Sequence, residues 1–171
     1  MEGRTLAIQD AVARASAYLS EHPDEARYRD AGATARLTAG LRVDVTGPGG
    51  ESLRTDMPRG IGGGATEPSP GWFFRAASAA CVASLIAIRA AATGATILSC
   101  EVRVDSESDD RGILGLDDDV PPGPLSTRIE ITIEAPGMQR AERLALGRWA
   151  VDHCPVTDAI ARAVPIEVDV R

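Results

Sequence analysis

One segment, residues 70–94, constrains the fold more than any other part of the chain. It begins after Ser69 with Pro70 and continues as an alanine-rich run with neither glycine nor proline from residue 72 until Gly94. Serine is a preferred residue before a helix, proline is favoured at the first helical position, and a glycine often follows the last turn. The sequence therefore predicts one helix of roughly 23 residues, about 35 Å long.

The predicted helix carries a stripe of very small side chains. They recur at alternating spacings of four and three residues and are Ala76, Ala80, Ala83, Ala87, Ala90 and Gly94. Residues at these spacings share one face of a helix, and side chains this small let a second helix approach closely. We therefore expect a tight helix pair, which a second copy of the chain could supply.

The segments before this helix predict one helix and two strands. Residues 5–20 place apolar side chains on one helical stripe, which is broken after His22. Residues 35–45 alternate between apolar and polar, so we expect one strand, a turn at 47–50 and a return strand at 51–55. Residues 56–70 are rich in glycine and proline and predict a loop whose backbone can approach another group closely.

The segments after the long helix predict two strands, two helices and a closing strand. Residues 98–105 and 128–133 alternate as half-buried antiparallel strands do. A helix is predicted over 138–151, a shorter one over 155–163, and a strand over 165–170. The predicted inward side chains of the first of these helices are Leu144, Ala145 and Trp149. Because strands and helices come in blocks, the predicted class is α+β with a mainly antiparallel sheet packed on helices.

Composition excludes several classes of function. The formal net charge is -7, so neither a nucleic acid nor an anionic membrane surface is an expected partner. All 18 basic residues are arginine, and the absence of lysine excludes P-loop phosphate binding and Schiff-base chemistry. The first residues lack a signal-peptide pattern, and the charge-free run 76–88 is too short to span a bilayer. We therefore expect a soluble, cytoplasmic protein.

Three cysteines stand in different contexts. Cys154 directly precedes Pro155 at a predicted helix start, where free N–H groups and the helix dipole favour a thiolate. Cys81 lies midway along the long helix, where both inert packing and reactivity remain open, and Cys100 on a strand predicts core packing. Because cytoplasmic thiols are kept reduced, a disulfide in this chain would be transient and catalytic rather than structural.

No motif indicates a metal or a cofactor. The cysteines and histidines lack metal-ligand spacing, and the acidic run 117–119 lacks the alternating ligands of a calcium loop. The glycine cluster 60–64 follows Pro58 and Arg59 rather than a buried strand, so it does not predict a dinucleotide site. We expect neither group to be bound.

Three stretches together resemble one known superfamily. They are Asp56-Met57-Pro58 with the glycine cluster, the Ala-Ala-Ser-Ala-Ala-Cys sequence that ends at Cys81, and Cys154-Pro155-Val156. The combination is similar to the osmotically inducible protein C and organic hydroperoxide resistance (OsmC/Ohr) superfamily. The resemblance covers residues 33–171 and leaves 1–32 as an N-terminal appendage helix. It implies an α+β fold in which mainly antiparallel sheets pack on two long central helices of an intertwined homodimer.

The resemblance also implies a function, a thiol-dependent peroxidase that protects against organic hydroperoxides in oxidative stress. Cys81 would attack the peroxide, and Cys154 would then form a disulfide with it, which a dithiol reductant opens. Arg59 is the first choice for the cation that holds the thiolate and Arg42 is the alternative. Glu67 is the carboxylate near the loop that could orient this arginine.

A second hypothesis is a non-catalytic OsmC-like protein that binds an apolar small molecule at the dimer interface. Peroxidase members of the superfamily carry a glutamate after the proline that begins the long helix, whereas this chain has Gly71 and Trp72 there. That difference favours binding, and the intact pair of cysteines favours peroxide reduction.

Overall fold

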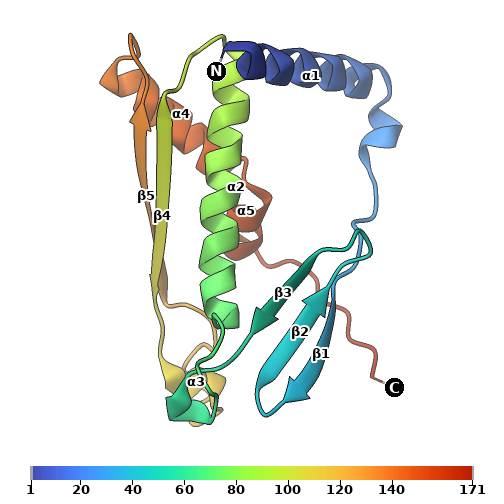
Figure 1. Ribbon diagram of the computed structural model, residues 1–171, viewed down its shortest axis with the longest axis vertical. Coiled ribbons are helices and arrows are strands. Elements are labelled where there is room, and N and C mark those ends of the chain that lie inside the picture. The colour runs from blue at the N-terminus through green and yellow to red at the C-terminus, as the bar shows by residue number, and fades with distance from the viewer. Residues whose placement is uncertain (1, 171) are drawn as a thin grey trace. The chain divides into compact units, whose positions relative to one another are not determined.

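The computed structural model of the protein describes residues 2–170, so Met1 and Arg171, the outer ends of the two predicted domains, lie outside the described residues. Its helices and strands come in blocks, which confirms the predicted α+β class (Figure 1). In chain order they are α1 (Glu2–Glu21), β1 (Thr34–Ala39), β2 (Arg42–Thr46), β3 (Ser52–Thr55), α2 (Pro70–Ala92), β4 (Ser99–Glu107), the one-turn α3 (Asp110–Ile113), β5 (Ser126–Glu134), α4 (Arg140–Asp152) and α5 (Pro155–Ala161).

The chain divides into two compact units. One contains residues 2–15 and 77–170, and the other contains residues 16–76. Helices α1 and α2 each contribute residues to both units. A domain boundary near residue 32 stays a prediction.

Strands β1, β2 and β3 form an antiparallel sheet in that order. The predicted turn at 47–50 and the return strand are confirmed, but the single predicted strand over 35–45 is wrong, because a turn divides it. Gly40 has φ +58° at this turn, a conformation that favours glycine. Pairing of Leu37 with Val43 keeps the apolar positions on one face. The alternation of apolar and polar residues therefore continues through the turn, and the sequence pattern does not reveal that the strand is divided.

The glycine-rich loop after β3 folds back on its own backbone. The Ala65 N–H donates to the Met57 carbonyl oxygen at 3.2 Å, and a short 3-10 turn spans Arg59–Ile61. A Cβ at Gly63 would lie 1.8 Å from the same carbonyl oxygen, so only glycine fits there. The backbone of this loop therefore approaches another group closely, as predicted, and that group belongs to the loop itself.

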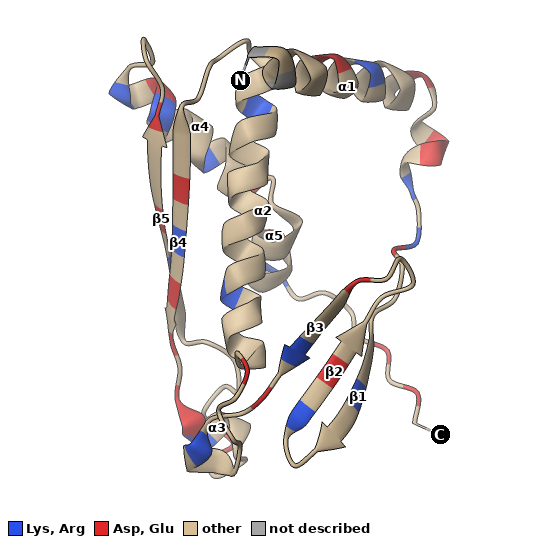
Figure 2. Ribbon diagram, in the orientation of Figure 1, with Lys and Arg blue, Asp and Glu red and all other residues tan. Residues whose placement is uncertain are grey.

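Helix α2 begins and ends where the sequence predicts. The Ser69 hydroxyl oxygen accepts a hydrogen bond from the Trp72 N–H at 3.2 Å, and Gly94 lies beyond the last turn with φ +74°. Between these ends only Arg75 and Arg89 are charged, as the two blue bands on an otherwise tan helix show (Figure 2). The helix is therefore apolar over most of its circumference.

Strands β4 and β5 form an antiparallel hairpin, as predicted, with Cys100 opposite Ile133 and Val104 opposite Ile129. Their half-buried side chains alternate with exposed ones, and several of them pack against the helices. The buried cluster at the centre of this unit joins α2, α4 and the start of α5, and its members are Val82, Ile86, Ala90, Leu146, Ala150 and Cys154.

Helix α4 forms where predicted but buries a face that matches the prediction only in part. Trp149 is half-buried and packs against the buried cluster, as predicted, whereas Leu144 and Ala145 are exposed, Leu144 at 59%. The buried residues are Leu146, Gly147 and Ala150. A Cβ at Gly147 would lie 3.3 Å from Ile131 Cδ1, so the helix comes closest to β5 at a residue without a side chain. Hydrophobicity alone could not identify that face.

The predicted closing strand at 165–170 is wrong for the described chain. These residues have no regular secondary structure and belong to neither sheet formed by residues 2–170, and Ile166 is 86% and Val168 81% exposed. A strand needs a neighbour for its N–H and C=O groups. The alternating pattern is present, but this chain supplies no edge that pairs with it.

By length and composition alone, α2 is the one helix among the described residues that could cross a membrane. The charge-free run within α2, residues 76–88, is too short to span a bilayer. All 23 residues of α2 together are long enough and apolar enough to do so. Core helices of soluble proteins satisfy them as well. Only 17% of the apolar window of α2 is buried, so much of its surface lacks a cover within this chain.

Truncation of Ile86 should destabilise the protein strongly, because its side chain is fully buried between α2 and α4. We expect Ile86→Ala to lower the free energy of unfolding by about 2–5 kcal/mol and Ile86→Val by about 0.5–1.5 kcal/mol. Denaturant unfolding measures both values. Equally small losses for the two variants would show that this cluster is not the core.

Candidate redox site

Two of the three cysteines meet although 72 residues separate them in the chain. Cys81 lies on α2 and Cys154 directly precedes α5, and the two thiols lie close enough to interact electrostatically. Cys154 is 0% exposed, whereas Cys81 is half-buried. The described cysteines contain no disulfide, so the pair is in its dithiol form.

The turn between α4 and α5 fixes the position of Cys154. The Thr157 hydroxyl contacts the Val151 carbonyl oxygen at 2.6 Å and the Cys154 carbonyl oxygen at 3.0 Å, which ties both helix ends together. Pro155 occupies the first position of α5, where its missing N–H costs nothing. The predicted helix start at Cys154 is confirmed.

The surroundings shift the two thiol pKa values in opposite directions. Burial raises the pKa of Cys81, and the neighbouring Cys154 thiol raises it further. Burial also opposes ionisation of Cys154, but the Cys81 thiol and the backbone N–H groups of Thr157 and Val156 outweigh it and lower the pKa of Cys154. The Cys154 sulfur makes no capping hydrogen bond of good geometry, so these N–H groups act mainly as nearby dipoles. The first proton therefore leaves the pair from Cys154.

His153 turns away from the neighbouring thiol. Its ring stacks on Trp149 with centroids 4.2 Å apart, and its Nδ1 lies 2.8 Å from the Trp149 carbonyl oxygen. The Arg89 guanidinium carbon lies 4.7 Å from the centre of the same indole ring. This stack holds the end of α4 beside α2 and leaves Cys154 without an imidazole base from His153.

Cys100 takes part in packing rather than in this pair. It is half-buried on β4 and contacts the buried cluster, and burial raises the pKa of its thiol. A raised thiol pKa lowers the fraction of reactive thiolate at neutral pH. Cys100 can therefore serve as an internal control in experiments on Cys81 and Cys154.

The remaining predicted site residues belong to the unit of residues 16–76. Arg59 begins the 3-10 turn of the glycine loop, and Arg42 begins β2, both exposed. Glu67 is half-buried ahead of α2 and lines a cleft of about 520 Å³ with Asp44 and Arg54. Within residues 2–170 no ion pair joins Glu67 to Arg59 or Arg42.

The structure adds a residue that sequence reasoning missed. Asp56 is 1% exposed, and its carboxylate accepts hydrogen bonds from the N–H groups of Met57, Gly64 and Thr66 and from the Thr66 hydroxyl. The Thr66 N–H is the strongest of several influences that lower the pKa of Asp56, although burial opposes them. An aspartate followed by a glycine- and threonine-containing loop is typical of such side-chain turns, and that signal was available.

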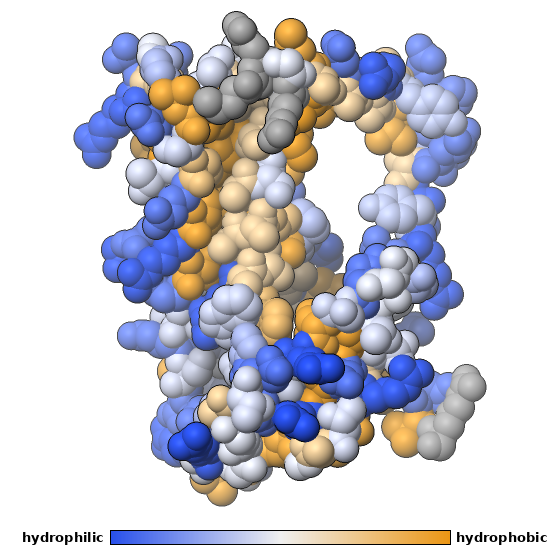
Figure 3. Space-filling model, viewed as in Figure 1, coloured by the Kyte–Doolittle hydropathy of each residue, from blue (hydrophilic) through white to orange (hydrophobic). Residues whose placement is uncertain are grey.

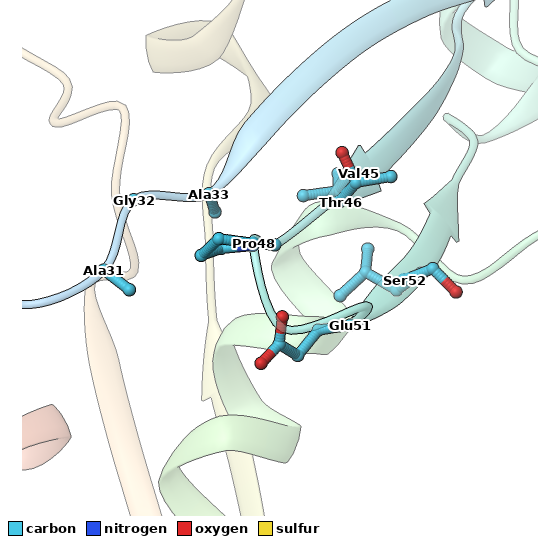
Figure 4. Close-up of a pocket in the computed structure, with 10 residues that line it drawn as sticks. Ala31, Gly32, Ala33, Val45, Thr46, Pro48, Glu51 and Ser52 are labelled. Atoms are coloured by element: carbon cyan, nitrogen blue, oxygen red, sulfur yellow. The ribbon is translucent and has the colours of Figure 1, made fainter.

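Three clefts formed by described residues have linings that contain neither cysteine of the pair. Figure 4 shows residues that line one of them, a pocket of about 280 Å³ beside β2 and β3 in which Glu51 is the only charged lining residue. A larger cleft of about 790 Å³ lies between β5 and α4 and is lined by isoleucines and by Arg140, Arg143 and Arg148. None of these three clefts is therefore formed around the thiol pair.

Comparison with known families identifies this fold as that of an OsmC-like α+β protein. The sequence profile described as OsmC-like protein matches residues 62–169. The chain belongs to this family, which confirms the predicted OsmC/Ohr membership. A search among curated protein sequences finds no match.

Solved structures show the same fold at low sequence identity. The chain is similar to an OsmC-like protein from Mycoplasma pneumoniae, with 16% identity, 80% of this chain and 91% of that chain covered, and a TM-score of 0.67. An organic hydroperoxide resistance protein OsmC from Legionella pneumophila has 22% identity, coverage of 78% and 90%, and a TM-score of 0.57. One from Elizabethkingia anophelis has 21% identity, coverage of 78% and 89%, and a TM-score of 0.58.

Oxidation should link Cys81 specifically to Cys154. The two thiols already interact, while Cys100 sits in the packing of β4. After brief treatment with an organic hydroperoxide and blocking of free thiols, peptide mass spectrometry should find the Cys81–Cys154 disulfide and alkylated Cys100. A dominant disulfide to Cys100 would contradict the assignment of the pair.

Removal of the Cys81 thiol should make Cys154 less acidic. The Cys81 thiol lowers the pKa of Cys154, so Cys81→Ala should raise that pKa and delay thiolate formation to higher pH. Thiolate ultraviolet absorbance measured against pH follows this change, with Cys100→Ala as the control that leaves the titration of Cys154 in place. An unchanged or lower Cys154 pKa in Cys81→Ala would refute the coupling.

Proposed function

We propose that this protein is a cytoplasmic thiol-dependent peroxidase that reduces organic hydroperoxides through Cys81 and Cys154. The observation that supports it most is the interaction between these two thiols at the start of α5. Membership of the OsmC-like family supports it as well, because structural neighbours include proteins named for organic hydroperoxide resistance. The activity would contribute to an oxidative stress response.

The reaction needs three balanced steps. The Cys81 thiolate attacks the outer peroxide oxygen, the O–O bond breaks, and the alkoxide leaves and is protonated to an alcohol, which oxidises Cys81 to sulfenic acid. The Cys154 sulfur then attacks the sulfenic sulfur, and water leaves as the disulfide forms. A dithiol reductant finally exchanges with this disulfide, restoring both thiols and becoming oxidised itself.

Access rather than acidity makes Cys81 the attacking residue. Cys154 ionises first but is 0% exposed, whereas Cys81 is half-buried and offers its sulfur to a substrate. Because the two thiols interact, transfer of the remaining proton from Cys81 to Cys154 would move the negative charge to Cys81. Cys154 is then in contact with the oxidised sulfur and suited to the second step.

A cation would stabilise the Cys81 thiolate and orient the peroxide. We assign this role to Arg59, with Arg42 as the alternative and Glu67 as the carboxylate that would orient the arginine. The Arg59 side chain is exposed and has no carboxylate within ion-pair distance among residues 2–170, so it is available for an anion. This arginine would act beside Cys81 without itself exchanging a proton.

The second candidate function is non-catalytic binding of an apolar small molecule at a dimer interface. Gly71 and Trp72 at the first turn of α2 favour it, because Trp72 is 49% exposed and its ring meets Phe73 edge-on with centroids 5.2 Å apart. An aromatic pair of this kind can hold an apolar ligand without any thiol chemistry.

We also propose that two copies pair through α2. Ala77, Ala80, Ala87 and Ile88 on this helix are exposed, and apolar colours run along it in Figure 3. The Ser84 hydroxyl donates to the Ala80 carbonyl oxygen of its own helix at 2.9 Å, so covering this face leaves no polar group unsatisfied. A second copy would cover the face, and an intertwined arrangement would also provide an edge for residues 165–170.

Peroxidase activity should depend on each cysteine of the pair in a different way. Cys81→Ser should abolish turnover of cumene hydroperoxide with a dithiol, because the attacking sulfur is absent. Cys154→Ser should still consume about one equivalent of peroxide and accumulate sulfenic acid, whereas Cys100→Ser should retain activity. Normal turnover by Cys81→Ser would contradict the proposed mechanism. A wild-type protein that binds apolar ligands without consuming peroxide would favour the binding hypothesis.

Charge on the small-residue face of α2 should separate the two copies. Ala80→Glu places a carboxylate where a second helix would approach closely, so we expect monomers in light scattering coupled to gel filtration. Ala80→Ser is the matched control, because a serine on this helix can bond to its own backbone as Ser84 does. A wild-type monomer, or a dimer unaffected by Ala80→Glu, would refute pairing through this face.

A further inference from the structure

We propose that Asp56 is a positioning residue of the peroxidase, which closes the loop of residues 57–66 and thereby holds the Arg59 turn in place for the thiolate. The inference rests on the proposed function, because Arg59 matters only if it serves Cys81. It assigns a role to a buried carboxylate that the peroxide chemistry itself does not use.

The first argument is the completeness of the carboxylate's contacts. One oxygen accepts from the Met57 N–H at 2.8 Å, and the other accepts from the Gly64 N–H at 3.1 Å, the Thr66 N–H at 3.1 Å and the Thr66 hydroxyl at 2.9 Å. Both ends of the loop are therefore tied to one side chain. Hydrogen bonds to an ionised acceptor are stronger than neutral ones, and loss of the charge would weaken all of them together.

The second argument is the backbone geometry between these contacts. Ala65 has φ +51° and is the only non-glycine residue of the described chain with a positive φ. Such a conformation costs energy and persists only where the surroundings enforce it. Its neighbours Gly64 and Thr66 both direct their N–H groups to the Asp56 carboxylate, which supplies the enforcement.

The third argument is that the closed loop fixes the Arg59 backbone. The Pro58 carbonyl oxygen accepts from the N–H groups of Ile61 and Gly63, and the Arg59 carbonyl oxygen accepts from Gly62. Gly63 in turn is pressed against Met57, where no side chain fits. The loop therefore has one compact arrangement, and Arg59 stands at its exposed turn.

Opening the loop should slow peroxide reduction in the way that removal of Arg59 does. The test measures the rate constant of Cys81 oxidation by cumene hydroperoxide in the full-length protein. Asp56→Asn weakens the contacts, and Gly63→Ala forces the loop apart without a change of charge. A displacement of about 1 Å at a catalytic group can cost up to ~100-fold in rate, so we expect each variant to be slower by roughly tenfold or more.

Two matched controls separate the loop from general effects of substitution. Gly60→Ala lies in the same loop, but a Cβ there would meet nothing within 4 Å, so its rate should stay within about twofold of wild type. Asp44→Asn removes a carboxylate of the same unit that pairs with Arg54 at 3.2 Å on the surface, and it should have equally little effect. If Asp56→Asn folds poorly by circular dichroism, Thr66→Val removes only the hydroxyl contact and replaces it in the test.

Coupling to Arg59 distinguishes positioning from general damage to the fold. Arg59→Gln should be slow, and Asp56→Asn combined with Arg59→Gln should be no slower than Arg59→Gln alone, because both changes remove one interaction. Additive losses in the double variant would overturn the inference, as would a slow Arg59→Gln together with a normal Asp56→Asn. A normal Arg59→Gln would also overturn it while leaving the peroxidase intact. A wild type without peroxidase activity would refute the proposed function, and the inference with it.

Discussion

The packing of α2 against the end of α4 is the interaction on which the redox site depends. Val82 and Ile86 of α2 are fully buried in the cluster that contains Ala150 and Cys154. Cys81 adjoins Val82 in the sequence, so the same contact that forms the core brings its thiol to Cys154. Burial of apolar side chains between α2 and α4 thus also positions the two sulfurs.

The thiols of Cys81 and Cys154 are the same chemical group in different surroundings, and the proposed cycle gives them different roles. Cys154 is buried at the start of a helix and ionises more easily, while Cys81 is less acidic and more accessible. Each thiol influences the ionisation of the other, so the pair behaves as one titrating unit. In the proposed cycle this division lets the accessible sulfur meet the peroxide and the buried sulfur meet only the oxidised cysteine.

Much of the remaining surface suggests a protein that is completed by a second copy. The long helix is apolar but only 17% of its apolar window is buried, and the segment after α5 exposes Ile166, Val168 and Val170. Isolated apolar residues on a surface are ordinary, but a whole helix face is not. The intertwined dimer that we propose would cover these surfaces and is consistent with the OsmC-like fold, which the structural neighbours share at under 25% identity.

The sequence by itself determined α2 from Ser69 to Gly94, the β4 and β5 hairpin, and the helix that starts after Cys154, because capping residues and period-two alternation act over short distances. It did not reveal the turn at Gly40, since the alternation continues through it, or the buried face of α4, which depends on contact with Ile131. The Asp56 loop had a local signal in its glycine and threonine residues, but the burial of the carboxylate and its set of contacts came only from the folded loop. The approach of Cys81 to Cys154 was implied by the family resemblance alone, and tertiary structure decided it, because it depends on the packing of α2 against α4, which local sequence patterns do not record.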